Sequence, residues 1–378
     1  MYIQKGNMTK GDLLNWAEIN LSAFTHNIKN LRQHLQPGTQ LMAVVKKNAY
    51  GHGAVQIAKA AVAAGAEWLG VHSLEEGLEL RNAGITAPVL ILGGVPLAQA
   101  IAIVEKKLTP TVTETKLPLA LDRAARELGT TIAVHVKVDT GINRSGASIE
   151  DIPHLLHFIY SLGRVRIGGL YTHFASADEP DRRVTETQLQ RFLEVAANHP
   201  ELRFLHAANS AAALRFPETH LNLVRVGIAM YGVYPPPATE KTVPLRPVLS
   251  LKSRVVRLHW IRPGEGVSYG LTWTAKTDAL MALVPFGYGH GLPRLLSNRG
   301  QVLIHGQRVP IRGRVCMDQC IVDVTTVPEV KVGDEVVLLG YQGSQEINAD
   351  EIANWADTIS NEVFTRVGAG LRRIYITK

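Results

Sequence analysis

The stretch LMAVVKKNAYGHGAVQIAKAAVAA, residues 41–64, joins two segments with different periodicities. Residues 41–46 form a short apolar run, which is typical of a strand buried on both faces. Residues 56–64 repeat apolar side chains at helical spacing. A buried strand followed by a helix is the building block of a parallel sheet, so this stretch indicates an α/β fold.

The same alternation continues through the first two-thirds of the chain. Predicted strands cover residues 41–46, 68–71, 89–93, 109–112, 133–138, 167–174, 204–209 and 223–227, and predicted helices cover residues 56–64, 74–83, 97–106, 116–128 and 185–197. Eight strands that alternate with helices predict a (β/α)₈ barrel. Two doubly wound domains are the alternative, but no G-x-G-x-x-G motif follows the first predicted strand.

The character of the sequence changes after Tyr234, where three prolines follow in a row. Consecutive prolines end regular structure and form a stiff connector. Beyond them, Gly and Pro turns separate β-type runs at 249–261, 279–285, 301–304, 321–324 and 335–339, and one helix is predicted at 349–357. We therefore predict a barrel domain over residues 22–237 and a mainly β domain over residues 238–378. Residues 12–21 have a strand-like core and are a candidate addition to the β domain.

The composition is that of an ordinary globular protein, with 46% hydrophobic and 19% charged residues. No apolar run reaches the roughly eighteen residues of a membrane helix, and residues 1–15 lack the apolar core of an export signal. Cys316 and Cys320 would be too far apart for a bridge on one strand, and no second Cys/His pair accompanies them as in a zinc site. We expect free thiols, no metal and a cytoplasmic location.

The net charge of +7 is spread along the chain, and the longest basic runs are pairs. Nucleic-acid-binding proteins usually concentrate their charge on one face or arm, so we expect neither nucleic acid nor a membrane as a partner. An anionic small molecule or cofactor explains the excess better. An ordinary solvated surface is the alternative.

Two lysines lie at the predicted strand ends, where barrel enzymes gather their catalytic groups. Lys46 ends the first predicted strand, and a desolvated amine there is suited to Schiff-base chemistry. A lysine that extends to water is the alternative. Lys137 shares the inward face of the fifth predicted strand with His135 and Asp139. A buried lysine needs a partner or must lose its charge, and an ion pair with Asp or Glu is one solution.

Two further strand ends predict a phosphate site. Ser210 occupies an N-cap position before an alanine-rich segment, and a helix N-terminus with a free hydroxyl binds anions. Gly227 ends the eighth predicted strand and allows backbone N–H groups to approach a ligand closely. Barrels commonly bind phosphate between the loops after strands seven and eight, which brings the two motifs together. Either one alone would be an ordinary cap or turn.

Five strings resemble motifs of the alanine racemase family: AVVKKNAYGHG (43–53), HVKVDTGINR (135–144), YTHFASAD (171–178), VSYGLTW (267–273) and GRVCMDQ (313–319). They are spread over both predicted domains. The resemblance implies an enzyme that uses pyridoxal 5′-phosphate (PLP) to interconvert L- and D-alanine, supplying D-alanine for peptidoglycan. It also implies a homodimer with shared active sites.

The resemblance assigns the two catalytic bases and the residues that assist them. Lys46 holds the cofactor and is one base, and Tyr269 is the other. His173 and Arg225 assist Tyr269 through hydrogen bonds, because a free tyrosine is a poor base near neutral pH. Arg225 also faces the pyridine nitrogen and leaves it unprotonated, which makes the ring a weaker electron sink and limits side reactions.

The resemblance also implies the remaining site residues. Lys137 is carbamylated and orients Arg144, which contacts the cofactor and the substrate. The backbone of Met317 binds the substrate carboxylate. Further cofactor contacts are Tyr50, His173, Asn209, Ser210, Gly227 and Ile228, and the entrance is lined by Asp178, Tyr288, Arg294 and Arg314.

Two positions depart from the family pattern. The segment 288–291 reads Y-G-H-G where Y-A-D-G is common, so the charge at the entrance differs. Asn361 stands where I-N-Y-E-V has a tyrosine. The smaller side chain, which also offers a donor and an acceptor, predicts a pocket that admits serine beside alanine.

Two other functions fit parts of the pattern. A PLP decarboxylase with the same architecture is one, but the strings around Lys46, Tyr269 and Met317 resemble racemases more closely. A non-enzymatic PLP carrier built on the barrel alone is the other, and it would lack the domain that supplies Tyr269.

Overall fold

The computed structural model describes residues 10–235, 243–368 and 370–377. The chain divides into two compact units. One is the barrel unit, Ala23–Arg246, and the other, the sheet unit, combines the residues up to Ser22 with those from Pro247 onward. Part of the predicted proline connector, residues 236–242, lies outside the described residues.

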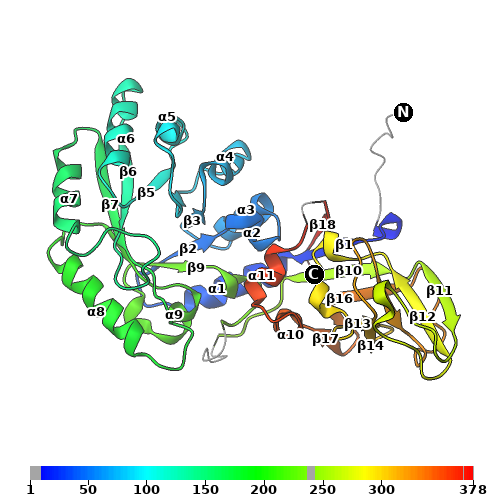
Figure 1. Ribbon diagram of the computed structural model, residues 1–378. Helices are drawn as coiled ribbons and strands as arrows, with labels where there is room; N and C mark the ends of the chain where they lie inside the picture. The colour runs from blue at the N-terminus through cyan, green and yellow to red at the C-terminus, as the bar shows by residue number, and fades with distance from the viewer. Residues whose placement is uncertain (1–9, 236–242, 369, 378) are drawn as a thin grey trace, which may run out of the picture. The chain divides into compact units, whose positions relative to one another are not determined.

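The barrel unit is built on eight strands that pair in parallel in the order β8-β7-β6-β5-β4-β3-β2-β9 (Figure 1). They are β2 Gln40–Val44, β3 Trp68–Val71, β4 Val89–Ile91, β5 Thr109–Val112, β6 Ile132–Lys137, β7 Val165–Tyr171, β8 Phe204–His206 and β9 Leu223–Val226. Each corresponds to one of the eight predicted strands, and the predicted (β/α)₈ barrel is confirmed.

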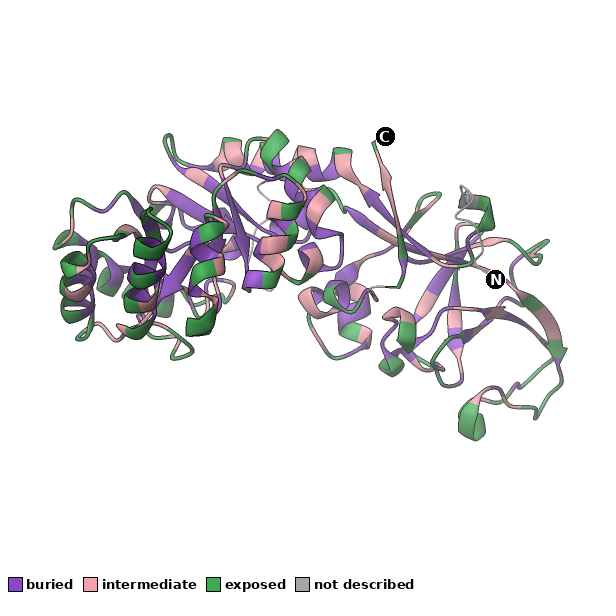
Figure 2. Cartoon of the chain, turned by 90° about the horizontal axis from the view of Figure 1, so that it is seen from above, coloured by how far each residue is buried: buried purple, intermediate pink, exposed green. Residues whose placement is uncertain are grey.

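Helices follow most of these strands and bury one face against them, while their outer faces are exposed (Figure 2). They are α1 Leu21–His34, α3 Ala54–Ala63, α4 Leu74–Asn82, α5 Ala100–Glu105, α6 Lys116–Glu127, α7 Ile152–Ser161, α8 Arg183–Ala197 and α9 Ser210–Arg215. The five predicted helices correspond to α3, α4, α5, α6 and α8, with α5 preceded by the short 3₁₀ helix η2, Leu97–Gln99.

The barrel is nearly closed. β9 pairs with β2, but β8 and β9 are not neighbours in the sheet. Hydrogen bonds span this gap: for example, the backbone N–H of Arg225 donates to the carbonyl of Ala208 at 3.0 Å, and that of Leu205 donates to Oδ1 of Asn222 at 2.8 Å. The end of β9 that carries Arg225 is therefore fixed to the loop after β8.

Large apolar side chains fill one layer of the barrel interior. Met42, Trp68, Leu90, Phe204 and Leu223 form one buried cluster contributed by five strands. Because such interiors are close-packed, shortening a buried aromatic residue of this layer to alanine costs roughly 3–5 kcal/mol of stability. This packed layer makes the barrel interior rigid, and the strands that form it carry the polar groups at their ends.

The sheet unit contains ten described strands in the order β11-β12-β15-β14-β13-β16-β10-β1-β18, with β17 paired to β16. They are β1 Trp16–Asn20, β10 Leu249–Arg254, β11 Arg257–Ile261, β12 Ala279–Val284, β13 Gln301–Ile304, β14 Gln307–Arg312, β15 Cys320–Asp323, β16 Glu335–Gln342, β17 Gln345–Ile347 and β18 Arg372–Ile376. All pairings are antiparallel except that of β1 with β18. The β domain that follows the barrel is mainly β, as predicted.

The sheet unit differs from the prediction in two places. The run 249–261 is not one strand, because the chain changes neighbours at Val255 and Val256: β10 pairs with β16, whereas β11 pairs with β12. Only Cys320 lies in a strand, and Cys316 lies in the loop before it. Both cysteines are free, as predicted.

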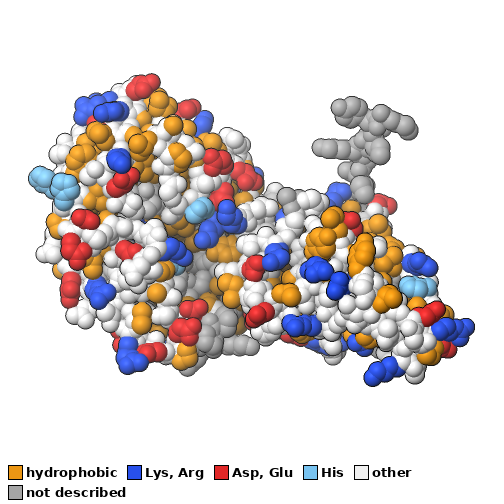
Figure 3. Space-filling model, in the orientation of Figure 1, with side chains coloured by type: hydrophobic (Ala, Val, Ile, Leu, Met, Phe, Trp, Pro, Cys, Tyr) orange, Lys and Arg blue, Asp and Glu red, His pale blue; other side chains and the backbone are white. Residues whose placement is uncertain are grey.

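The predicted helix near the C-terminus is α10, Ala349–Trp355, and α11, Ser360–Thr365, follows it. Asn348 caps α10, and Glu351 donates its N–H to the Asn348 side chain and accepts from the Asn348 N–H in return. Among the helices of the described ranges, none is both long and apolar enough to cross a membrane. On the face shown in Figure 3, basic and acidic side chains are interspersed.

Candidate active site

Lys46 follows the first barrel strand directly and begins the short helix α2, Lys46–Tyr50. The prediction that Lys46 ends the strand is wrong by two residues, since β2 ends at Val44. The turn is left-handed: Lys47, Asn48, Ala49 and Tyr50 all have φ between 51 and 53°. A left-handed conformation costs roughly 1–2 kcal/mol for each residue other than glycine, so the surrounding structure has to impose this turn.

Hydrogen bonds on both sides of the turn stabilise it. The N–H of Ala49 donates to the carbonyl of Val45 at 2.8 Å, and that of Gly51 donates to the carbonyl of Lys47 at 3.1 Å. Oδ1 of Asn48 accepts from the N–H of Ala54 at 2.8 Å and so connects the turn to the start of α3. The turn is thus held at both of its ends.

The Lys46 amine lies in an environment that favours its neutral form. Burial lowers its pKa, and the positive charge of Arg144 lowers it further, while Glu76 acts in the opposite direction. A neutral amine is the form that can attack a carbonyl carbon. This supports the nucleophilic role inferred from the strand end.

Tyr50 lies against the end of β9. A Cβ added to Gly227 would lie 2.6 Å from the Tyr50 hydroxyl, so only glycine leaves room for the ring there. Burial raises the pKa of Tyr50 to about 12, which keeps the hydroxyl protonated and able to donate. The ring also lies 5.0 Å from that of Tyr231, centroid to centroid.

The loops after β8 and β9 meet at Ser210. Its hydroxyl accepts from the backbone N–H of Gly227 at 2.9 Å and from that of Ala229 at 3.4 Å. The prediction that Ser210 is the N-cap of α9 is wrong: the cap is Asn209, whose Oδ1 accepts from the N–H of Ala212 at 3.0 Å. Ser210 is the first residue of the helix, and its hydroxyl is directed to the neighbouring loop instead.

Tyr50, Ser210 and Gly227 therefore lie together, as the sequence predicted. Ile228 follows Gly227 as a buried residue at the start of the 3₁₀ helix η4, Ile228–Tyr231. A phenol and a hydroxyl beside the start of a helix are donors of the kind that bind a phosphate.

Arg225 is buried at the end of β9 and anchored at many points. Its Nη atoms donate to the carbonyls of His206, Thr172 and Ala207 at 3.0, 2.7 and 2.9 Å. They also lie 2.9 Å from Nδ1 of His206 and 3.3 Å from Nδ1 of His173. Burial lowers the pKa of Arg225 to about 10, so the guanidinium stays charged at neutral pH.

The histidines around Arg225 form a chain whose tautomers follow from its geometry. Because Arg225 donates to Nδ1 of His206, the proton of neutral His206 is on Nε2, which lies 2.9 Å from Nδ1 of His135. The proton of His135 is then on its own Nε2, a buried atom without a hydrogen-bond partner among the described residues. Burial, and then the charge of Arg225, lower the pKa of His135 to about 3 and that of His206 well below its usual range.

His173 is a second histidine whose ring contacts Arg225. Its pKa is lowered well below the usual range, mainly by burial and next by Arg225. With Nδ1 accepting from Arg225, the proton of His173 is on Nε2 and available to a further acceptor.

Lys137 is buried, and its amine is hydrogen-bonded to a hydroxyl. Nζ donates to the hydroxyl of Ser145 at 2.6 Å, and no ion pair to it occurs within the described ranges. The alternative of an ion pair with Asp or Glu is therefore not realised. Burial, followed by the charges of Arg144 and Arg225, lowers the pKa of Lys137 to about 8, although Asp139 raises it.

Asp178 lies half-buried on the loop after β7. The guanidinium of Arg215 fixes this loop by donating to the carbonyls of Ala177 and Glu179, at 2.6 Å each. The barrel unit thus places Lys46, Lys137, Arg144, His173 and Arg225 close enough for their charges to affect the pKa of His173. Tyr50, Ser210 and Gly227 form a second group at the end of β9.

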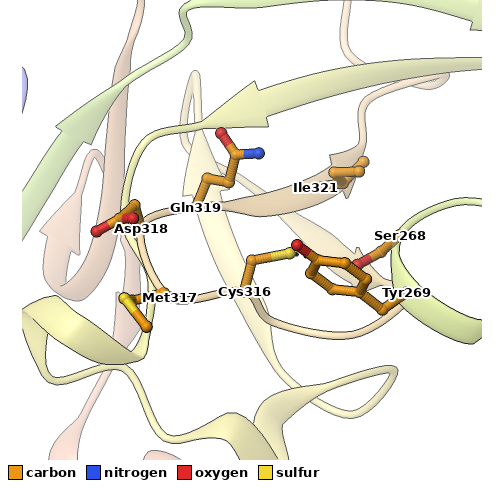
Figure 4. A pocket seen from close by; sticks show the side chains of 7 residues that line it. All are labelled: Ser268, Tyr269, Cys316, Met317, Asp318, Gln319 and Ile321. Atoms are coloured by element: carbon orange, nitrogen blue, oxygen red, sulfur yellow. Dashed lines mark hydrogen bonds between the residues drawn. The ribbon is translucent and has the colours of Figure 1, made fainter.

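The other predicted residues belong to the sheet unit. Tyr269 is 71% exposed and lines a pocket of about 420 Å³ with Ser268, Cys316, Met317, Asp318, Gln319 and Ile321 (Figure 4). Tyr269 begins the 3₁₀ helix η5, Tyr269–Leu271, and the loop before β15 supplies the opposite wall.

This pocket brings several predicted residues together. The hydroxyl of Ser268 donates to the carbonyl of Arg314 at 2.5 Å, and the Arg314 guanidinium lies beside Gly270. Tyr288 donates its N–H to the carbonyl of Cys316 at 3.0 Å, next to Met317. Tyr269, Tyr288, Arg314 and Met317 thus form one exposed surface.

Arg294 and Asn361 lie on other segments of the sheet unit, at the start of the 3₁₀ helix η7, Arg294–Leu296, and in α11. His290, which replaces the aspartate of the common family pattern, accepts from the N–H of Gly287 through Nδ1 at 3.2 Å and packs against Phe286. Its ring is occupied in shaping the turn that carries Tyr288.

Sequence reasoning missed three features: the left-handed turn after Lys46, the chain from Arg225 to His135, and the contacts of Glu76. Asn48 is the one residue in the turn with a known tolerance for positive φ. His135 and His206 could have been found from the inward alternation of their strands. The pattern Ser73-x-x-Glu76 is a local signal for a helix start, but the contact of Glu76 with Lys47 is 29 residues away and leaves no local signal.

Comparisons with known proteins agree over nearly the whole chain. A family model described as the alanine racemase N-terminal domain matches residues 19–235, and one described as the alanine racemase C-terminal domain matches residues 248–375. The alanine racemase of Desulfovibrio desulfuricans is 44% identical over 365 residues, covering 96% of this chain and 98% of that protein. That of Symbiobacterium thermophilum is 45% identical, covering 95% and 96%.

Solved structures show the same likeness. Alanine racemase of Clostridium difficile matches with a TM-score of 0.92 and 35% identity, covering 97% of this chain and 96% of that one. The Bacillus anthracis enzyme with bound L-Ala-P matches with a TM-score of 0.90, 36% identity and coverage of 96% and 95%. The Bartonella henselae enzyme with covalently bound pyridoxal phosphate matches with a TM-score of 0.88, 28% identity and coverage of 96% and 100%. With both of its units matched and such relatives over nearly its full length, this chain belongs to the alanine racemase family.

Proposed function

We propose that this chain interconverts L- and D-alanine with PLP as its cofactor, and that Lys46 and Tyr269 are its two catalytic bases. Membership of the family makes it an amino-acid racemase of the alanine racemase type. The observation that carries the cofactor assignment is the arrangement of a lysine with a lowered pKa, Lys46, in the same barrel mouth as the hydroxyl groups of Tyr50 and Ser210 beside Gly227.

The residues present fit PLP. The hydroxyl groups of Tyr50 and Ser210 supply phosphate donors, and the missing side chain of Gly227 leaves room for the Tyr50 hydroxyl. The Nη atoms of Arg225 are all directed to protein acceptors. Its Nε–H is the donor left for the pyridine nitrogen, since none of the described residues accepts from it. When bound, PLP withdraws electrons from the α-carbon of the substrate and so acidifies its α-proton.

The chain's own residues move the proton. Racemisation needs one base on each face of the α-carbon, because a single base tends to return the proton to the face from which it came. Burial lowers the pKa of Lys46, which makes its Nζ better suited to accept and release a proton near neutral pH. The Tyr269 hydroxyl serves the other face and returns a proton there.

Arg225 determines whether the pyridine nitrogen of the cofactor is protonated. A guanidinium with a pKa of about 10 is a donor at neutral pH, so it leaves the pyridine nitrogen an acceptor. The neighbouring histidines, whose pKa values are lowered, add no second positive charge. This supports a weak electron sink that limits side reactions.

Lys137 is proposed to carry a carbamate that orients Arg144. Carbamylation requires a neutral amine, and the lowered pKa of Lys137 provides one. The nearby positive charges of Arg144 and Arg225 would then face a new negative charge. This relieves the unfavourable burial of several cations in one region.

We further propose a homodimer in which each chain completes the other's site. Tyr269 and Met317 are exposed by 71% and 56% in the single chain, together with Leu271 at 59%. An exposed apolar patch around a reactive group is typical of a surface that a partner covers. Mixing Lys46→Ala and Tyr269→Phe chains, each inactive alone, should restore part of the activity if the sites are shared. Proven heterodimers without activity would contradict sharing.

The substrate is a small amino acid, with alanine as the main one. Asn361 favours serine as a second substrate, since it provides an amide where the family pattern has a larger tyrosine. A cytoplasmic role in supplying D-alanine for peptidoglycan agrees with the free thiols of Cys316 and Cys320.

The cofactor lysine can be identified directly. The full-length chain is loaded with PLP, reduced with sodium borohydride and mapped by peptide mass spectrometry, beside a chiral assay of alanine and serine. We expect the pyridoxyl group on Lys46, its loss in Lys46→Ala and its retention in the neighbouring control Lys47→Ala. A label on another lysine would overturn the assignment.

A further inference from the structure

Glu76 lies in the first turn of α4 and connects the loops after two adjacent barrel strands. Its Oε1 accepts from the backbone N–H of Lys47 at 2.8 Å, after β2, and its Oε2 accepts from that of His72 at 2.6 Å, after β3. Each carboxylate oxygen thus binds one backbone N–H of a different loop. Charge-assisted bonds of this kind are stronger than those between neutral groups.

The bond to Lys47 is made at the first residue of the left-handed turn. The later N–H groups of the turn, those of Ala49, Gly51 and Gly53, donate to carbonyls within the turn. The first N–H, that of Lys47, donates to Glu76 instead. Left-handed residues persist only where the surroundings over-determine them, and this contact fixes the turn at its first left-handed residue.

Glu76 also acts on the amine of Lys46. Burial and Arg144 lower the pKa of Lys46, whereas the negative charge of Glu76 raises it. The same carboxylate therefore holds the backbone next to Lys46 and moderates the loss of its proton.

We propose that Glu76 is a positioning residue that clamps the left-handed turn to the loop after β3 and thereby fixes the direction in which the Lys46 side chain leaves the barrel strand. The proposal rests on the proposed function, in which Lys46 holds the cofactor. A carboxylate is required because both oxygens accept, and glutamine would offer one acceptor and present a donor to the other N–H.

A role limited to stabilising α4 is the alternative, since acidic side chains in a first turn favour a helix. Glu75 provides the matched control. It lies in the same turn with the same charge, but its Oε1 accepts from the exposed side chain of Gln99 at 3.1 Å.

The first experiment measures amide hydrogen exchange of the full-length holoenzyme for Glu76→Gln and Glu75→Gln. We expect the amides of Lys47 and His72 to exchange about ten-fold faster in Glu76→Gln, which corresponds to the loss of one charge-assisted bond. Exchange in Glu75→Gln should match the wild type. Unchanged exchange in Glu76→Gln, or equal changes in both variants, would overturn the clamp.

The second experiment reads the Lys46 amine itself, on full-length chain from which PLP has been removed. The pH dependence of Lys46 acetylation by acetic anhydride, followed by peptide mass spectrometry, should shift to lower pH in Glu76→Gln and not in Glu75→Gln. A helix-stabilising role would not produce this shift, so an unshifted profile contradicts the proposal.

Glu76→Asp separates the effect of the carboxylate charge on Lys46 from that of its hydrogen bonds to the backbone. It also replaces Glu76→Gln as the test if that variant does not fold. It keeps the charge but is one methylene shorter, so we expect a nearly normal acetylation profile with faster Lys47 exchange. Normal exchange in this variant would contradict the clamp. Failure of the proposed function is recognised separately, as the absence of a pyridoxyl group on wild-type Lys46.

Discussion

The hydroxyl of Ser210 accepts a hydrogen bond from the backbone N–H of Gly227 over 2.9 Å. The two residues follow β8 and β9, the adjacent strands that do not pair in the barrel sheet. The contact therefore holds together the two loops that form the proposed phosphate site, at the point where the sheet itself does not.

Gly227→Ala should weaken PLP binding. The added Cβ would lie 2.6 Å from the Tyr50 hydroxyl, so the ring must move away from the proposed phosphate. Losing one donor to a charged group predicts a dissociation constant about ten-fold higher or more, measured by fluorescence titration. Gly94→Ala is the control, since no atom lies within 4 Å of its added Cβ. Equal affinity in both variants would argue against Tyr50 as a phosphate ligand.

Lys137 should become carbamylated near neutral pH. A pKa of about 8 leaves roughly one amine in ten neutral at pH 7, against fewer than one in a thousand for an ordinary lysine. With ¹³C-bicarbonate, NMR should show a carbamate signal that increases as the pH rises through about 8. The signal should vanish in Lys137→Arg and persist in the exposed control Lys116→Arg. A signal that survives Lys137→Arg would assign it elsewhere.

The buried histidine chain should make the fold sensitive to acid. The folded pKa of His135 is about 3 and the unfolded pKa about 6.5, so the unfolded chain binds more protons between these values. Stability is therefore lost as the pH falls below about 6.5, by about 2 kcal/mol for His135 at pH 5. Urea unfolding of His135→Gln should show a shallower decrease from pH 7 to 5 than the exposed control His154→Gln. Parallel slopes would refute this account.

Asn361→Tyr should narrow the substrate range. A serine hydroxyl that finds a partner in the pocket avoids a desolvation cost of roughly 1–3 kcal/mol, enough to change selectivity about ten-fold. We expect the ratio of kcat/KM for serine to that for alanine to fall when the tyrosine is introduced. The neighbouring Glu362→Gln serves as a control on α11, and a ratio that does not fall would remove Asn361 from the explanation.

The sequence was sufficient for the barrel because its strands are buried on both faces. Each appears as a short apolar run, and residues 68–71 and 109–112 were predicted with the observed bounds. It was insufficient for residues 249–261, where β-type residues continue through Val255. The structure divides this run into β10, which pairs with β16, and β11, which pairs with β12. Partner exchange is a property of the folded sheet and leaves no mark on local periodicity.

The residues of the proposed site also fall into those that the sequence predicted and those that it did not. Lys46, Ser210 and Gly227 were selected because each carries its chemistry in its residue type and its position near a strand end, whereas Tyr50 was selected through the family resemblance. The sequence could not show that Asn209, and not Ser210, is the N-cap of α9, because both residue types cap helices well. Glu76 was missed because one of the two backbone groups that it binds, the N–H of Lys47, is far away in sequence.

The left-handed turn also restricts which sequences this protein can accept. Lys47 is exposed, and at an exposed position most side chains are normally interchangeable. Its φ of 53° removes that freedom, because valine or isoleucine would meet its own backbone there. The four positions after Lys46 are therefore selected by the handedness of the main chain, and a mutational scan should find an intolerant surface residue where neither packing nor chemistry would explain it.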